Sequence, residues 1–241
     1  MMSQKTLKQR IRNGEIINSI GVPMDIEKGE LTDILSKREC DYLNVDAQHG
    51  PFNEAHLVAF CIMARELNLP VQIRIKHTLH AYLIGNYLDL GPSGIMVPEV
   101  ESEAIVDEAV NAFYYPQMGK RSWGGIHRVG LDERPDRLKY APWWNAYGWL
   151  AIQIESVEAV INAAQLAKPG VDVLNFGPND LMFSIEAHPQ FPYRTVEDCV
   201  KHVLDQVKDT QVKVGMSAET PEERDQYVNW GVTVFPKRIG I

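Results

Sequence analysis

Polar side chains that could take part in chemistry occur in four segments of this sequence, each at the end of a short apolar run. Residues 46–50 contain Asp46, Gln48 and His49, and Arg74 stands between two isoleucines. Glu155 follows the run 150–154, and residues 177–180 form a Gly-Pro-Asn-Asp turn that opens a helix. Carboxylates, an Asp/His pair and an arginine are residue types that acid–base catalysis and the binding of charged groups use. We interpret the four segments as parts of one site.

Each of these residues also has an interpretation that involves no function. Asp46 or Glu155 alone could cap a helix. Arg74 could belong to an interior ion pair, and His49 could be a hydrogen-bonded loop residue. The agreement of four strand ends favours a common site. The other histidines have no comparable context and receive no role, and the aromatic runs 114–116 and 143–144 are interpreted as packing residues.

Short apolar runs alternate with amphipathic helical patterns along the whole chain. The runs are continuously apolar, as parallel strands covered on both faces require. Eight strands in a repeating strand–helix order predict an α/β fold, a (β/α)8 TIM barrel; an open doubly wound sheet is the alternative, weakened by the lack of a glycine-rich nucleotide-binding motif. No linker or repeat divides the chain, so residues 1–241 are predicted to form a single domain. The expected strands are residues 16–21, 42–46, 71–75, 94–97, 150–154, 171–176, 212–216 and 232–235.

Helical patterns lie between these strands. Apolar residues in 196–208 recur at helical spacing and form one stripe. The last helix has strong start signals, with Thr220 as cap, Pro221 at the first helical position and Glu223 three residues after the cap. The weakly patterned segment 114–140 is predicted to be a long loop with a function. The expected helices are residues 53–66, 79–88, 103–113, 157–168, 196–208 and 221–229.

Composition and charge exclude several classes of protein. The formal net charge is −8 at pH 7 and no basic stripe is present, so we expect no nucleic-acid partner. The longest strongly apolar stretch, residues 57–64, is too short to span a membrane, and the polar amino terminus does not resemble a secretory signal. The three cysteines are far apart in the sequence and their number is odd. This indicates reduced packing residues in a cytoplasmic protein rather than a set of disulfides; the cysteines are Cys40, Cys61 and Cys199.

Taken together with other elements, these segments resemble the HpcH/HpaI family, the class II pyruvate aldolases that include macrophomate synthase. The similarity extends over roughly residues 15–235, and the elements occur in the family's order with similar spacing. Any one element is weak evidence for the family, but the ordered series is specific. The matching elements are residues 46–50, Arg74, residues 88–91, residues 115–125, residues 153–156 and residues 177–181.

The resemblance implies that Glu155 and Asp180 bind one divalent cation per subunit, Mg2+, Mn2+ or Co2+. Pyruvate would chelate the cation through its carboxylate and C2 carbonyl. Backbone N–H groups around Asn179 and Asp180 would hold the carboxylate. Arg74 would bond the C2 oxygen and stabilise the enolate that forms there. The resemblance implies further substrate contacts from Gln153, Gly177, Pro178, Arg121 and Trp123.

The resemblance also implies that His49 is the acid/base group, acting through a water on the metal, with Asp46 and Asp89 orienting its ring. In cleavage, His49 would take the proton of the C4 hydroxyl while the enolate leaves. The implied activity is reversible aldol cleavage of 4-hydroxy-2-oxo acids to pyruvate, or a close 2-oxo acid, and an aldehyde. The family resemblance further implies a homo-hexamer.

Two departures from the family pattern limit what it implies. Many relatives have glutamate where Gln48 stands, so a neutral amide beside a metal-bound water would change the local charge. The carboxyl end, residues 234–241, lacks the Gly-x-Asp close expected after the last strand. Stopping there would shorten the final helix, which relatives use in subunit exchange. The acceptor aldehyde and the oligomer are therefore left open.

Three rival functions remain at this stage. Lys76 lies two residues beyond Arg74, on the same side of the strand, and a desolvated lysine there could form a Schiff base. An acyl-CoA lyase of the citrate-lyase type would use similar metal-enolate chemistry, although no basic cluster for the CoA phosphates is evident. A non-catalytic carboxylate-binding barrel could keep Glu155 and Asp180 without turnover, and Gln48 is the feature that suggests it.

Overall fold

The computed structural model describes residues 5–238, which form a closed barrel of eight parallel strands in the order β1 to β8. Each strand pairs with the next in sequence, and β8 pairs with β1. The predicted single (β/α)8 barrel is therefore confirmed, and the open doubly wound sheet is wrong. The strands are β1 Ile17–Gly21, β2 Tyr42–Asp46, β3 Val71–Arg74, β4 Gly94–Val97, β5 Trp149–Ile154, β6 Val173–Phe176, β7 Lys213–Gly215 and β8 Val234–Arg238.

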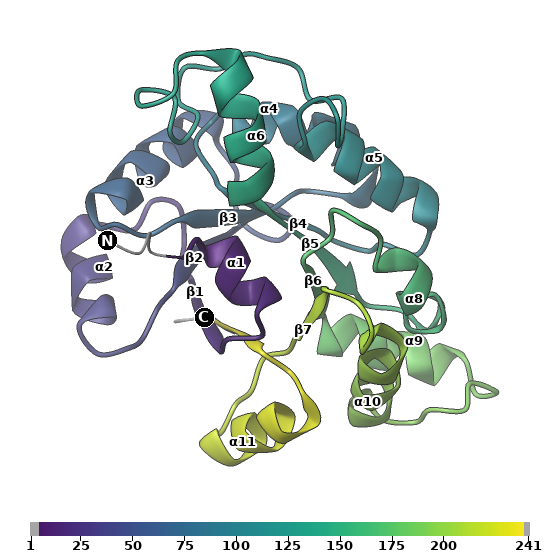
Figure 1. Ribbon diagram of the computed structural model, residues 1–241. Coiled ribbons are helices and arrows are strands. Elements are labelled where there is room, and N and C mark those ends of the chain that lie inside the picture. Colours follow the sequence, from purple (N-terminus) through teal and green to yellow (C-terminus); the bar gives the residue numbers. More distant parts are fainter. Residues whose placement is uncertain (1–4, 239–241) are drawn as a thin grey trace.

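Helices surround the barrel, as the ribbon diagram shows (Figure 1). The predicted helices are confirmed, except that residues 79–88 are a 3-10 turn followed by α4 and residues 157–168 are two short helices. Helices α1, α2 and α6 were not predicted, and α6 begins inside the segment expected to be a loop. The helices are α1 Leu7–Arg12, α2 Lys28–Leu35, α3 Glu54–Glu66, η1 Thr78–Leu83, α4 Ile84–Leu88, α5 Glu103–Phe113, α6 Arg137–Tyr147, α7 Val157–Ile161, α8 Ala163–Leu166, α9 Pro178–Ala187, α10 Val196–Val207 and α11 Pro221–Trp230.

The side chains of β5 show how the barrel separates its two cores. Trp149 and Ala151 pack in the cluster inside the barrel, whereas Leu150 and Ile152 pack in the cluster between the strands and the helices. Successive side chains of a strand point to opposite faces. Gln153, the next residue in this alternation, therefore also points into the barrel. It lies near the mouth that the carboxyl ends of the strands form.

Helix α1 closes the opposite end of the barrel and lies across it in Figure 1. Ile11 belongs to the inner cluster, and the buried Lys8 amine donates to the Tyr114 hydroxyl at 2.7 Å and to the Gly148 carbonyl at 2.8 Å. The same amine lies 3.4 Å from an oxygen of the fully buried Asp172. Burial lowers the pKa of Lys8 to about 8, against the opposing charge of Asp172. This network joins the amino-terminal helix to β5 and β6.

We expect Lys8→Met to lower the free energy of unfolding by about 3 kcal/mol, because removing one member of a buried ion pair leaves the other without compensation. Urea unfolding followed by circular dichroism measures this. Lys5→Met is the matched control, since the Lys5–Glu15 pair lies at the surface and such pairs contribute about 0–1 kcal/mol. Equal stability of the two variants would contradict this, and would show that Arg12 is sufficient to compensate the charge of Asp172, to which it also donates.

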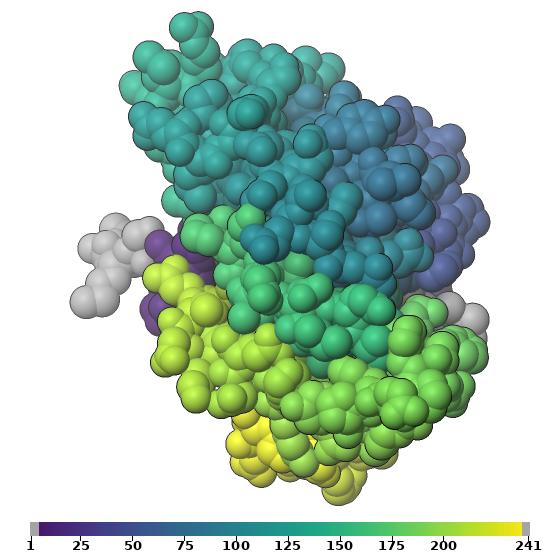
Figure 2. Space-filling view, turned by 90° about the vertical axis from the view of Figure 1, so that its right-hand side faces the viewer, coloured from purple at the N-terminus to yellow at the C-terminus, as the bar shows by residue number. Residues whose placement is uncertain are grey.

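The segment 114–147 forms a prominent part of the surface, shown in teal at the top of Figure 2. Its inner side is aromatic: Tyr114, Tyr115 and Trp144 are buried, and the Trp144 indole donates to the Phe113 carbonyl at 3.0 Å. Their interpretation as packing residues is confirmed. The three cysteines are free, and two of them are buried. Within residues 5–238, no helix has the length and apolar character needed to cross a membrane.

Candidate active site

A hydrogen-bonded set of side chains connects three strands at the mouth of the barrel. Arg74, at the end of β3, is buried, and its Nε donates to Asp46 Oδ1 at 2.8 Å. A second guanidinium nitrogen bonds the other Asp46 oxygen, and the third lies 3.4 Å from Gln153 Oε1. Burial opposes ionisation of Asp46, but the hydrogen bonds and charge of Arg74 hold its pKa below the ordinary value. The interior ion pair considered for Arg74 is thus present, and it lies among the predicted site residues.

Glu155 lies next to this set, directly after β5, and is also buried. Its Oε2 accepts the backbone N–H of Glu99 at 2.9 Å. Its Oε1 lies against Gly177, where an added Cβ would stand 2.4 Å away, so a larger residue at that position would displace the Glu155 side chain. Burial raises the pKa of Glu155 to about 7; the Glu99 N–H and the charge of Arg74 oppose this rise, and the charge of Asp180 adds to it.

Gly177 also fixes the start of helix α9. Pro178 occupies the first helical position and Asp180 lies in the first turn, so the Asp180 carboxylate is held at the end of β6 beside Glu155. No side chain caps this helix, and Asn179 and Asp180 are exposed. The first N–H groups of a helix attract anions when no side chain occupies them. The predicted substrate residues Gly177, Pro178, Asn179 and Asp180 therefore lie together with Gln153 and Glu155.

The two carboxylates fit a divalent cation. The charge of Asp180 adds to the cost of ionising the buried Glu155, and a cation between the two carboxylates would reverse this effect. Among the described residues, no group of three or more His, Cys, Asp or Glu side chains could hold a metal ion. A cation held by the two carboxylates of Glu155 and Asp180 would keep several positions for water and substrate oxygens, as Mg2+ usually does.

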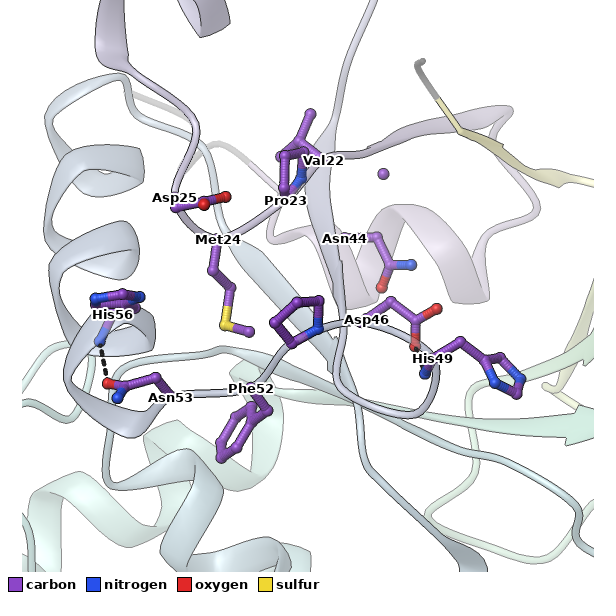
Figure 3. A pocket seen from close by; sticks show the side chains of 13 residues that line it. Val22, Pro23, Met24, Asp25, Asn44, Asp46, His49, Phe52, Asn53 and His56 are labelled. Carbon is purple, nitrogen blue, oxygen red and sulfur yellow. Dashed lines mark hydrogen bonds between the residues drawn. The ribbon is translucent and has the colours of Figure 1, made fainter. Parts of the chain in front are cut away.

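His49 lies on the loop that follows Asp46. The Asp46 carboxylate accepts the backbone N–H of Gln48 at 3.0 Å and that of His49 at 3.4 Å, which fixes the turn. The His49 side chain is exposed and lines a cavity of about 480 Å³ (Figure 3). Asp46 thus holds the backbone of the His49 loop, while its proposed orientation of the imidazole ring stays a prediction.

Glu99 was not among the predicted site residues. It follows β4 after Pro98 and has a left-handed backbone with φ +52°, which is uncommon for a residue other than glycine. Its Oε1 accepts from the Gln48 amide at 3.0 Å, and its Oε2 lies 3.6 Å from His77 Nε2. Gln48, predicted to act beside the metal, therefore donates to the side chain of Glu99, and the backbone N–H of the same residue donates to Glu155.

A second network joins the segment 114–147 to the end of α4. It contains Arg121 and Trp123 of that segment and Asp89, which follows α4. Arg121 is buried, donates to Asp89 Oδ1 at 2.8 Å and lies between the rings of Tyr115 and Trp144. Trp123 is partly exposed, with the Arg128 guanidinium 3.9 Å over its ring. The contacts of these residues support the loop, and their predicted roles toward substrate and toward His49 stay predictions.

A family model described as HpcH/HpaI aldolase/citrate lyase matches residues 24–236, which include every residue of both networks. The chain belongs to the HpcH/HpaI aldolase/citrate lyase family. It is 29% identical over 202 residues to 2-dehydro-3,6-dideoxy-6-sulfogluconate aldolase of Pseudomonas putida, which covers 79% of this chain and 74% of that protein. It is 27% identical over 213 residues to hydroxypyruvate/pyruvate aldolase of Roseobacter denitrificans, covering 88% of this chain and 81% of that one.

The fold agrees with this family. The crystal structure of an HpcH/HpaI aldolase from Desulfitobacterium hafniense DCB-2 superposes with a TM-score of 0.81 at 22% identity, covering 98% of this chain and 91% of that one. Because the matched relatives are aldolases of a lyase family, this HpcH/HpaI protein is a carbon–carbon lyase. The last three residues of the carboxyl end, where the sequence departs from the family pattern, lie outside the described residues.

Lys76, the candidate for a Schiff base, lies beyond the end of β3. Its side chain is exposed, and its amine lies 5.4 Å from the centre of the Phe52 ring. It lines a neighbouring hollow with Asn53 and Tyr87 rather than the cavity beside His49. A Schiff-base lysine is usually activated by desolvation or by a neighbouring cation. The exposed position of Lys76 therefore disfavours the Schiff-base mechanism.

The backbone of Glu99 gives a prediction for stability. We expect Glu99→Gly to have a free energy of unfolding about 1 kcal/mol higher than Glu99→Ala, because both lose the carboxylate but only glycine adopts a positive φ without cost. Thermal and urea unfolding of the two variants measure this difference. The result is contradicted if alanine is as stable as glycine, which would mean that the loop relaxes to an ordinary φ.

Proposed function

We propose that this lyase is a divalent-metal-dependent pyruvate aldolase, which cleaves 4-hydroxy-2-oxo acids reversibly to pyruvate and an aldehyde. The observation that carries the proposal is the buried Glu155 carboxylate, which has a pKa raised to about 7 by burial and lies beside the charge of Asp180. A buried carboxylate that is costly to ionise alone is suited to bind a cation. Arg74 and Gln153 supply hydrogen-bonding groups at the same mouth.

A cation bound by Glu155 and Asp180 would supply Lewis-acid polarisation of the ketone at C2 of pyruvate. The N–H groups at the start of α9 would bind the pyruvate carboxylate. Arg74, held in one orientation by Asp46 and Gln153, would donate to the C2 oxygen and stabilise the negative charge that develops there. Gln153 and the Gly177–Pro178 turn would restrict how the ketoacid lies.

His49 would transfer the proton, because it is the imidazole on the loop fixed by Asp46. In cleavage, His49 would accept the proton of the C4 hydroxyl. The C3–C4 bond would then break, and the electron pair of that bond would remain on the pyruvate enolate. Gln48, bonded to Glu99, would orient a water near the site. The proposal also includes the roles that the family resemblance implies: Asp89 would orient the His49 ring, and Arg121 and Trp123 would contact the substrate. It includes the homo-hexamer on the same ground.

The test is deuterium incorporation at C3 of pyruvate, followed by NMR in D2O, which requires no knowledge of the aldehyde. The protein is first stripped with a chelator and then given Mg2+, Mn2+ or Co2+. We expect exchange only after metal is added, and a sharp fall in exchange in His49→Ala. Absence of exchange with all three metals would overturn the proposal.

The rival functions give different results in the same assay series. A Schiff-base aldolase would exchange without metal and lose activity with borohydride and pyruvate. An acyl-CoA lyase would exchange protons of a CoA thioester and not of pyruvate. A binding protein without turnover would bind pyruvate and metal but show no exchange.

A further inference from the structure

The cavity beside His49 lies over the carboxyl ends of β1 and β2. Its walls come from the end of β1 and the loop that follows, residues 21–25, and from the end of β2, the loop after it and the start of α3. It shares Asp46 and His49 with the proposed catalytic centre, so it extends from the point at which the proton would be transferred. At about 480 Å³ it is large enough for a molecule the size of a substituted benzene ring, within the range of ligand pockets.

The lining of this cavity is mainly apolar. Several apolar residues contribute to it, and Figure 3 shows Met24 above Phe52, to the left of the middle of the view. They are Val22, Pro23, Met24, Pro51 and Phe52. A methionine thioether is flexible and polarisable, so it adapts to apolar ligands of varied shape. These walls suit a hydrocarbon body better than a polar one.

The charged groups of the cavity disfavour an anionic ligand. Its lining includes the carboxylates Asp25 and Asp46 and the imidazoles His49 and His56, but no lysine or arginine among the described residues. The guanidinium of Arg74 is bound to Asp46 and Gln153.

The start of helix α3, which borders the cavity, is not a free anion site either. The Asn53 side chain caps it by accepting the His56 N–H at 3.1 Å, and Glu54 lies in its first turn. A carboxylate on the ligand would therefore lose hydration without gaining a cationic partner.

We propose that this cavity binds the acceptor aldehyde and that the preferred acceptor has an uncharged, mainly apolar body. The inference rests on the proposed aldolase function. In the addition direction, the electron pair at C3 of the pyruvate enolate forms the new bond to the aldehyde carbon. The carbonyl π electrons move to the aldehyde oxygen, which takes up a proton from His49. No oxidant, reductant or further reactant is required.

The test compares acceptors that differ only in a carboxylate: benzaldehyde against 4-carboxybenzaldehyde, and butanal against succinic semialdehyde, each with pyruvate and Mn2+. We expect kcat/KM for the uncharged member to be higher by at least about tenfold, because like charges at a binding site are strongly unfavourable. Met24→Arg, or Pro23→Arg at an exposed position if the first variant folds poorly, should bring the ratio to about one or below. Leu138→Arg, on the exposed side of α6, is the matched control and should keep the ratio of the unmodified protein.

C3 exchange of pyruvate is measured on the same samples. Absence of exchange overturns the proposed function and this inference with it. Exchange together with a preference for the carboxylate-bearing acceptors overturns this inference alone. If Lys76→Met then removes that preference, Lys76 is the cation that reaches the acceptor across Phe52, contrary to the proposal.

Discussion

Glu155→Gln is expected to lower metal-dependent C3 exchange of pyruvate by about a thousandfold, because Lewis-acid stabilisation contributes several kcal/mol and each 1.36 kcal/mol is a factor of ten. The substitution keeps the shape of the side chain, and the amide can still accept the Glu99 N–H. It removes one of the two negative charges that would hold the cation. Asp180→Asn removes the other and should have a similar effect.

The same variant tests the pH dependence of metal binding. Burial raises the pKa of Glu155 to about 7, so below pH 7 the cation must displace a proton from this carboxyl. The affinity of the unmodified protein for Mn2+ should rise about tenfold per pH unit below pH 7 and level off above it. Calorimetry across this pH range measures the affinity and the proton release. In Glu155→Gln, binding should be much weaker and should lack this slope.

Glu158→Gln is the control, since Glu158 is an exposed acid three residues away on α7. Its exchange rate and its affinity for Mn2+ should match those of the unmodified protein. Two results together would show that Glu155 is not a metal ligand. Glu155→Gln would exchange C3 protons at a rate within tenfold of the unmodified protein, and metal binding would not depend on pH in either protein. A catalytic cation would then need other ligands.

The strands were predictable because parallel barrel strands are buried on both faces and therefore form continuous apolar runs. Each of the eight predicted strands overlaps an observed one, with differences of up to three residues at the ends. The helices that were missed lack such a signal. Only Leu31 is buried in α2, and α6 contains Pro142 in its interior, which removes a helical hydrogen bond.

The ends of the strands were sufficient to predict part of the site, but one strand end that belongs to it was missed. It brought together Asp46, Arg74 and Glu155, whose contacts the structure describes. Glu99 also follows a strand closely, and this position was a signal that could have been used. Its left-handed backbone could not be inferred, because glutamate has no preference for that conformation. The hydrogen bond between Gln48 and Glu99 could not be predicted from the sequence either, because it depends on how the loops after β2 and β4 pack together.

Arg74→Met is expected to lower the rate of C3 exchange by a factor of about 100 to 1,000, the range found when one donor to a developing oxyanion is removed. Methionine replaces the aliphatic part of the arginine side chain and supplies neither a charge nor a donor. Arg74→Lys should recover little of this loss, because an ammonium cannot reproduce the paired contacts with Asp46 and the third contact with Gln153.

Loss of activity alone would not distinguish a direct role from support of the loop, since Arg74 also neutralises Asp46. Asp46→Asn separates the two, because it keeps the arginine charge and weakens the ion pair that positions it. A direct role predicts that Arg74→Met loses more exchange than Asp46→Asn and binds pyruvate more weakly in the presence of Mn2+. Equal losses in both variants, with unchanged pyruvate affinity, would instead assign Arg74 to holding the loop that carries His49.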